Sequence, residues 1–118
     1  PKIPANIEQL FTPSETRPNY IFQTFLYASI MCRQQTLKVA PALLYIHRAA
    51  SDSYSPVIEM GEPRQPKIPV NNFTFFEDEF RKRLQTLLEE IFSENEPFTQ
   101  TEDIKKCSYC DFKAICKR

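Results

Sequence analysis

The sequence predicts a mixed α/β (α+β) domain in the order helix, strand, weak hairpin, helix and cysteine-containing tail. Three observations support this prediction. Apolar side chains recur at helical spacing in residues 19–35 and again after Thr74. Between these segments the short run Ala42–His47 is continuously apolar, as in a strand that is buried on both faces. Ten prolines and a single glycine punctuate the chain, which excludes glycine-rich loops for phosphates or dinucleotides.

Length and charge predict one small domain without a global electrostatic field. The chain has 118 residues, with 15 basic and 15 acidic side chains, so any nucleic-acid binding must come from a local patch. The sequence contains no apolar run long enough to span a membrane and no secretory signal. We therefore expect a cytoplasmic protein with no membrane partner. Because the chain starts at Pro1 without an initiator Met, we also expect it to lie inside a longer protein.

The first elements are a lead-in and a helix. Residues 1–18 hold four prolines and predict an extended linker with one turn around Ile7–Phe11. Residues 19–35 lack proline and glycine, and the spacing of Phe22, Phe25 and Ile30 predicts a largely buried helix. The strand Ala42–His47 follows this helix.

The second half of the core consists of a hairpin and a helix. Weak strand signals at residues 57–60 and 68–73 flank a turn at residues 61–66, and Pro69 places the second strand at a sheet edge. Thr74 as N-cap and Glu77 three residues later predict a capping box for the second helix. Asn95 and Pro97 mark its end. Residues 19–96 therefore form the core, and residues 97–118 form a tail with a final helix from about residue 111.

The tail holds three of the four cysteines, with the spacing C-x2-C-x5-C at Cys107, Cys110 and Cys116. Such a cluster in a chain without a signal peptide is typical of metal or cluster ligands. Zinc and an iron–sulfur cube each need four ligands, so the fourth must be Cys32, His47 or a residue upstream of the chain. The spacing does not distinguish zinc from iron–sulfur, and three reduced thiols are the alternative. Cys32 on its own is typical of a small core residue.

Cations and aromatic side chains surround these cysteines. A mixture of this kind can follow a phosphate backbone and stack on bases. A solvated basic tail explains it equally well. The candidate DNA-contact residues are Lys105, Lys106, Tyr109, Lys113, Lys117 and Arg118.

Gln23 and Tyr27 place an amide and a phenol on one face of the first helix, at positions i and i+4. A Q-x-x-x-Y helix, a buried strand, a long helix and a terminal C-x2-C-x5-C, in that order, resemble the RecB/AddB branch of the bacterial PD-(D/E)XK nucleases. The CRISPR-associated iron–sulfur exonucleases share this layout. The resemblance covers about residues 19–118 and is most specific at residues 23–27 and 99–118.

The resemblance implies a partial restriction-endonuclease-like core and a set of roles. Gln23 and Tyr27 would border the active site and the DNA. Cys107, Cys110 and Cys116 would be the last three ligands of a four-iron (4Fe-4S) cluster that pins the tail to the core. The first ligand would precede the nuclease core. The family's catalytic Asp and Glu-x-Lys, which hold Mg2+ and activate water, would lie upstream of residue 1.

Two D-x-K triplets, Asp103–Lys105 and Asp111–Lys113, lie in the tail rather than on a strand, and we interpret them as chance matches. The expected function is the C-terminal part of a Mg2+-dependent DNA exonuclease or nuclease in DNA repair or recombination, beside a helicase subunit or domain. The 118-residue chain by itself would be inactive. The alternatives are a non-catalytic, zinc- or cluster-stabilised module that binds nucleic acid or protein, and a degenerate nuclease domain kept for structure.

Overall fold

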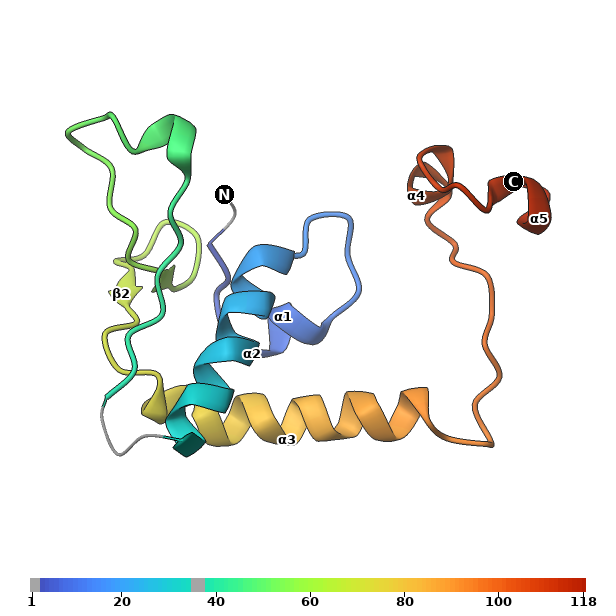
Figure 1. The fold of residues 1–118 in the computed structure, drawn as a ribbon, viewed down its shortest axis with the longest axis horizontal. Helices are drawn as coiled ribbons and strands as arrows, with labels where there is room; N and C mark the ends of the chain where they lie inside the picture. Colours follow the sequence, from blue (N-terminus) through green and yellow to red (C-terminus); the bar gives the residue numbers. More distant parts are fainter. Residues whose placement is uncertain (1–2, 35–37) are drawn as a thin grey trace. The chain divides into compact units, whose positions relative to one another are not determined.

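A computed structural model describes residues 3–34 and 38–118 (Figure 1). The chain divides into a larger unit, Pro1–Leu88, and a smaller unit, Glu89–Arg118. The elements in chain order are α1 (Glu8–Phe11), α2 (Asn19–Gln34), the 3-10 helix η1 (Ile46–Arg48), β1 (Glu59–Met60), β2 (Ile68–Pro69), α3 (Thr74–Ile91), α4 (Ile104–Ser108) and α5 (Lys113–Cys116). The prediction of a mixed fold with two long helices is confirmed. Gln35, the last residue of the first predicted helix, lies outside the described residues.

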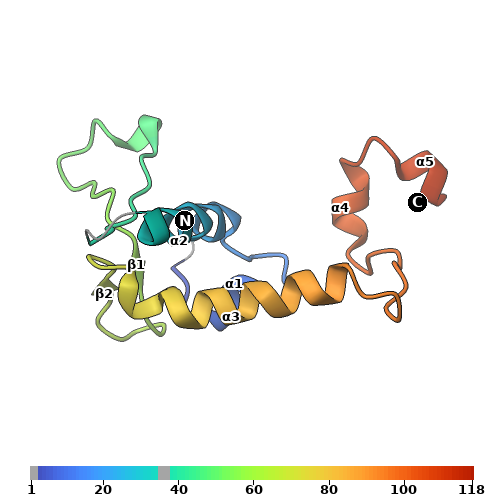
Figure 2. The ribbon, with the colours of Figure 1, turned by 60° about the horizontal axis from the view of Figure 1, so that its bottom comes forward.

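Aromatic rings form the centre of the larger unit. The ring centroid of Phe80 in α3 lies 5.2 Å from that of Phe11, 5.6 Å from Phe22, 5.9 Å from Phe73 and 6.1 Å from Phe25. Figure 2 shows α1 and α2 beside the N-terminal half of α3. Centroid spacings of this size are those at which tilted and edge-on ring pairs attract one another. This cluster therefore fixes α2 against α3.

The N-terminal segment contributes to the same core. Ile7 and Leu10, on either side of the start of α1, are 1% and 0% exposed. The carbonyl of Pro4 accepts a hydrogen bond of 3.0 Å from the N–H of Gly61. The turn predicted at residues 7–11 is therefore present as α1, and its apolar side chains are part of the packed unit.

Only one face of α2 is buried. Ile21, Phe25 and Ala28 point into the core. The opposite face exposes large side chains, namely Tyr20, Tyr27, Ile30 and Met31. The prediction of a largely buried helix is therefore wrong for this face, because among the described residues the aromatic core contacts of α2 come from α1, Phe73 and α3, all on one side.

The predicted strand Ala42–His47 is also wrong. Its described pairing is one isolated bridge between Ala42 and Val57, and the 3-10 helix η1 begins at Ile46. Leu44 is 66% exposed and Ile46 is 83% exposed. A strand buried on both faces needs neighbouring strands and covering layers on both sides, and within the described residues this segment has neither.

A tyrosine hydroxyl forms hydrogen bonds with the backbone of this segment. The hydroxyl of Tyr54 donates to the carbonyl of Leu43 at 2.5 Å and accepts from the N–H of Tyr45 at 2.7 Å. The N–H of Leu43 donates to the carbonyl of Pro56 at 2.8 Å. One edge of the segment is thus satisfied by residues 54–56.

The weak hairpin is confirmed in a short form. β1 and β2 pair antiparallel, with Glu59 opposite Pro69 and Met60 opposite Ile68. The described sheet has two strands, so both are edge strands and Pro69 removes no donor from a central ladder.

The hairpin turn requires its glycine. Gly61 has a φ of 151°, and a Cβ there would lie 3.2 Å from the carbonyl oxygen of Pro66. The ammonium of Lys67 donates to the carbonyl of Gly61 at 2.9 Å and also to that of Glu62. Any side chain at Gly61 would strain this turn.

The second predicted helix is confirmed as α3, but its predicted capping box is wrong. The side-chain oxygen of Asn72 accepts from the N–H of Thr74 at 3.2 Å and from its hydroxyl at 2.8 Å. Thr74 is already helical and so is not the N-cap, and Asn72 forms an Asx-type turn onto it just before the helix. One carboxylate oxygen of Glu77 is buried without a hydrogen bond among the described residues.

The smaller unit consists of the end of α3 and the two short helices α4 and α5. The amide of Gln100 donates to the carbonyl of Cys116 at 3.2 Å and accepts from Nε of Arg118 at 3.1 Å. No residue in this unit is buried. In the part of the chain that the structure describes, no helix has the length and apolar character needed to cross a membrane.

Candidate functional site

The predicted polar pair on α2 is present as a hydrogen bond. The amide nitrogen of Gln23 donates to the phenol oxygen of Tyr27 at 3.1 Å. Both side chains are exposed, and Tyr27 is 58% exposed. The helical i, i+4 spacing brings the two tips together without help from another element. The location of this pair beside an active site stays a prediction.

The three tail cysteines are free thiols. Cys107 and Cys116 are half-buried and Cys110 is exposed. The sulfur of Cys107 donates a weak hydrogen bond of 3.9 Å to the carbonyl of Asp103. Across residues 3–34 and 38–118, no group of three or more His, Cys, Asp or Glu side chains lies close enough to hold a metal ion. Thiols are the correct donors for zinc or iron–sulfur chemistry, but this conformation does not gather three of them at one point.

The two candidates for a fourth ligand lie in the larger unit. Cys32 packs against the hydrophobic core from α2. Its burial, and secondarily the negative charge of Glu77, raise the pKa of the Cys32 thiol above its ordinary value. His47 is exposed on η1. Cys32 therefore has the surroundings of a small core residue.

Neither D-x-K triplet lies on a strand. Asp103 precedes α4, and its carboxylate lies 3.5 Å from the ammonium of Lys106. Asp111 lies in the turn before α5. These are the surroundings that chance matches would have.

The predicted DNA-contact residues of the tail are all exposed, and Tyr109 is 94% exposed. Lys106 forms its ion pair with Asp103, and Arg118 donates to Gln100. These cations are therefore exposed to solvent, and two of them also form contacts within the tail. Contact with DNA stays a prediction for Lys105, Lys106, Tyr109, Lys113, Lys117 and Arg118.

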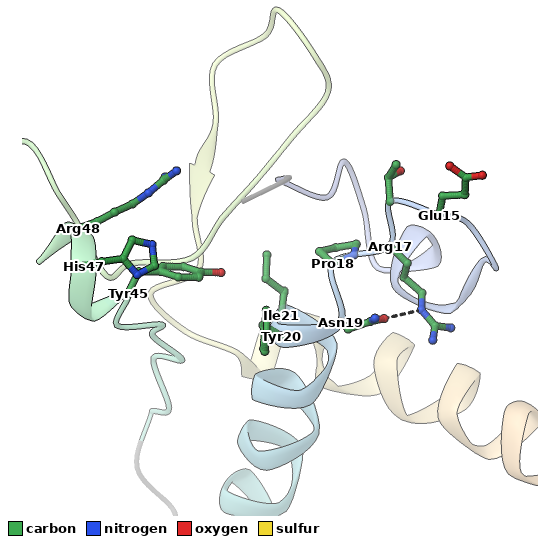
Figure 3. Close-up of a pocket in the computed structure, with 10 residues that line it drawn as sticks. Glu15, Arg17, Pro18, Asn19, Tyr20, Ile21, Tyr45, His47 and Arg48 are labelled. Carbon is green, nitrogen blue, oxygen red and sulfur yellow. Dashed lines mark hydrogen bonds between the residues drawn. The ribbon is translucent and has the colours of Figure 1, made fainter. Parts of the chain in front are cut away.

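The structure also shows a cleft that the sequence did not predict. Its volume is about 480 Å3, and it lies between the start of α2 and η1. Figure 3 shows Tyr45, His47 and Arg48 on one wall, and Arg17 with the first residues of α2 on the other. The sequence contains a weak signal for it, since cations flank both the start of the first helix and the end of the apolar run.

The comparison with known protein families gives one result. A family model for the PD-(D/E)XK nuclease superfamily matches residues 8–117. Searches of curated proteins and of solved structures gave no significant match. The matched range extends from the start of α1 to the end of α5. It thus includes the exposed Gln23–Tyr27 pair, the cleft and the cysteine tail, and the chain belongs to the PD-(D/E)XK nuclease superfamily.

Proposed function

We propose that this chain is the C-terminal part of a Mg2+-dependent, RecB/AddB-like DNA nuclease that acts in DNA repair or recombination. The observation that carries the proposal is the exposed Gln23–Tyr27 hydrogen bond on α2, in a chain whose family match covers residues 8–117. A Q-x-x-x-Y pair at a nuclease site must be accessible to a phosphodiester. The exposure of both side chains meets this requirement.

The Gln23–Tyr27 pair retains hydrogen-bond donors for a substrate. A glutamine amide has two N–H donors, and the bond to Tyr27 uses one of them. The phenol of Tyr27 accepts that bond, so its own O–H remains available. Two donors on one helix face can hold a phosphate oxygen or a base edge. We infer that Gln23 and Tyr27 position DNA beside the catalytic carboxylates.

The backbone of the segment around Leu44 favours a larger sheet than the one described. Successive residues of an extended segment direct their backbone groups to opposite edges. Leu43 and Tyr45 face Tyr54, so the N–H and C=O of Leu44 face away from it, and among the described residues neither has a hydrogen-bond partner. We infer that this edge pairs with a strand of the nuclease sheet.

In this proposal the Asp and Glu-x-Lys of the family lie on strands outside the chain. Mg2+ held by those carboxylates would supply the activated water. The chain by itself is then inactive. A helicase subunit or domain as partner stays a prediction of the resemblance, which co-purification with the full gene product would test.

The smaller unit supports a bound cluster. It has no buried residue, and it exposes the apolar side chains of Tyr109, Phe112 and Ile115. A unit this small cannot be stabilised by a hydrophobic core and usually needs a metal or a disulfide. We infer that Cys107, Cys110 and Cys116 hold a 4Fe-4S cluster together with a ligand outside the chain. Zinc is the alternative.

The cleavage test compares two proteins, the 118-residue chain and the gene product extended to its natural N-terminus. Each is incubated with linear single- and double-stranded DNA and Mg2+ or Mn2+. We expect cleavage by the extended protein only. Gln23→Ala should lower its rate by roughly tenfold or more, because a hydrogen bond to a charged group contributes about 1.5–3 kcal/mol. Gln34→Ala, which changes an exposed glutamine of the same helix, is the matched control.

Other outcomes would contradict the proposal. Cleavage by the short chain would place the active site within it, and Asp103 and Asp111 would then be candidates for its catalytic carboxylates. No cleavage by the extended protein would favour the degenerate domain or the interaction module.

The cluster has a test of its own. Iron, sulfide and zinc are measured in the extended protein after anaerobic purification. We expect iron and sulfide to be lost in Cys110→Ser and retained in Cys32→Ser. Retention of metal in Cys110→Ser would remove the tail from the ligand set.

A further inference from the structure

The cleft between the start of α2 and η1 has the size of a ligand site. Its volume of about 480 Å3 falls inside the range of roughly 300–1,000 Å3 that is typical of such sites. Ile21, which is 5% exposed, lies at its base, and Pro18 and Tyr20 line the α2 side. The cleft lies wholly within the larger unit.

One wall carries an arginine that is held in place. Nε of Arg17 donates to the side-chain oxygen of Asn19 at 2.9 Å, and its guanidinium carbon lies 6.0 Å from the ring centroid of Phe22 (Figure 3). The bond through Nε leaves the terminal nitrogens of the guanidinium for a ligand. In Figure 3 this guanidinium lies beyond Asn19, on the side away from Arg48, so Arg17 adds positive charge to this wall but does not face Arg48 across the cleft.

The opposite wall adds a second arginine and aromatic rings. Arg48 forms no ion pair among the described residues and points toward the cleft (Figure 3). The rings of Tyr45 and His47 lie edge to face with centroids 6.3 Å apart. Flat ring faces beside a cation are the arrangement that stacks a base and holds its phosphate.

Two acidic residues near the cleft affect how strongly it can bind an anion. Glu15 lines the cleft, where the two arginines outweigh its charge. Glu59 lines an adjoining hollow of about 220 Å3 that shares Tyr45 and Arg48. The cleft is therefore suited to an anion, with a carboxylate at its margin that should weaken the binding.

The cleft also connects with the polar pair of α2. Tyr20 lines the cleft and lies one and two turns from Gln23 and Tyr27 on the same exposed face. Seven residues of helix span about 10 Å. A nucleic-acid strand that leaves the cleft along α2 would reach the pair directly.

We propose that this cleft binds one nucleotide of single-stranded DNA, with its phosphate against Arg48 and its base against Tyr45 and His47. The inference rests on the proposed nuclease function and adds a site that guides the strand to Gln23 and Tyr27.

The test measures binding without cleavage. A fluorescently labelled single strand of about 15 nucleotides, long enough for typical single-strand sites, is titrated with the complete chain in EDTA, and anisotropy is recorded over a range of salt concentrations. Arg48→Gln should weaken binding at least about fivefold and reduce the slope of log K against log salt by about 0.7. Arg64→Gln removes the same charge from the hairpin turn of the same unit and should change neither quantity.

Two further variants test the chemistry of the cleft. Glu15→Gln should tighten binding, because it removes the only carboxylate among the described residues that line the cleft. His47→Ala should weaken binding by loss of a stacking face. A duplex of the same sequence and a deoxynucleoside monophosphate serve as competitors. If the monophosphate competes as well as the strand does, the ligand is a free nucleotide and the proposal is overturned.

The two proposals fail separately. Equal binding by Arg48→Gln and Arg64→Gln, with both variants folded by circular dichroism, would overturn the cleft and leave the nuclease proposal intact. Absence of any single-strand binding would also overturn the proposed binding site in the cleft. The nuclease proposal is tested separately, by whether the extended protein cleaves DNA. If the cleft binds DNA as expected but the extended protein does not cut, the nuclease proposal fails and the cleft stands.

Discussion

At the residue scale, the Tyr54 hydroxyl joins two backbone groups of one extended segment, the carbonyl of Leu43 and the N–H of Tyr45. Tyr54→Phe would remove both hydrogen bonds and leave two part-buried backbone groups without partners. We expect a loss of about 1–3 kcal/mol in the free energy of unfolding, measured by urea denaturation. Tyr20→Phe, which alters a 68% exposed tyrosine, should change it by less than about 0.5 kcal/mol. Equal effects would show that the Tyr54 hydroxyl contributes nothing.

Cys32 is the residue whose chemistry the fold alters most clearly. Burial, and then the charge of Glu77, raise the pKa of its thiol. A raised pKa means less thiolate at a given pH, and the thiolate is the form that reacts. Alkylation of Cys32 at pH 8 should therefore be slower than that of the exposed Cys110, and its rate should rise at a higher pH. Peptide mass spectrometry after timed iodoacetamide treatment measures both rates.

Glu77→Gln separates the two causes of this shift. It removes the charge but not the burial, so the alkylation profile of Cys32 should move modestly toward lower pH. A profile identical to that of the unaltered chain would assign the whole effect to burial.

At the element scale, the two long helices could be predicted because their apolar residues repeat at helical spacing over many residues. The run Ala42–His47 could not, because a short apolar run looks the same whether its neighbours lie in the chain or elsewhere. α1 and α4 are too short to show a period. At the start of α3, Asn72 and Thr74 are both good capping residues, and only the backbone decides that Thr74 is already helical and that Asn72 accepts from its N–H.

The contribution of α3 to the core depends on which of its phenylalanines is changed. Phe80 is fully buried among four other rings, whereas Phe75 in the same helix is 82% exposed. Phe80→Ala should cost about 3–5 kcal/mol in the free energy of unfolding. Phe75→Ala should cost less than about 1 kcal/mol. Thermal and urea unfolding of both variants measure this difference, and similar losses would mean that the aromatic core is wrongly placed.

At the scale of the whole molecule, the candidate site divides into a part that sequence could predict and a part that it could not. Gln23 and Tyr27 are four residues apart on one helix, so their contact follows from helical spacing alone. Arg17 and Arg48 are far apart in the sequence, and only the fold places both at one cleft. Likewise, the spacing of the tail cysteines predicts that they could share a metal. Spacing alone does not predict whether the folded chain brings the three sulfur atoms together.

The larger unit should fold without the smaller one. Its buried residues lie between Pro4 and Phe80, and residues 89–118 include no buried side chain. In metal-free protein, truncation after Ser93 should leave the unfolding temperature within a few degrees. Truncation before Thr12 removes Ile7 and Leu10 from the core and should lower it sharply. Calorimetry of the two truncated chains measures this contrast, and a large loss in the first would show that the tail stabilises the core.

The backbone edge at Leu44, which no described residue pairs, has a consequence for handling the protein. Open strand edges with apolar side chains are templates for edge-to-edge association of identical chains. Leu44 combines such an edge with a side chain that is 66% exposed, and Ile46, the first residue of η1, adds an apolar side chain that is 83% exposed. The chain on its own should therefore form soluble aggregates as its concentration rises, visible by light scattering. Leu44→Lys should suppress them, so that the edge which suits this chain to a sheet also limits the concentration at which it stays monomeric.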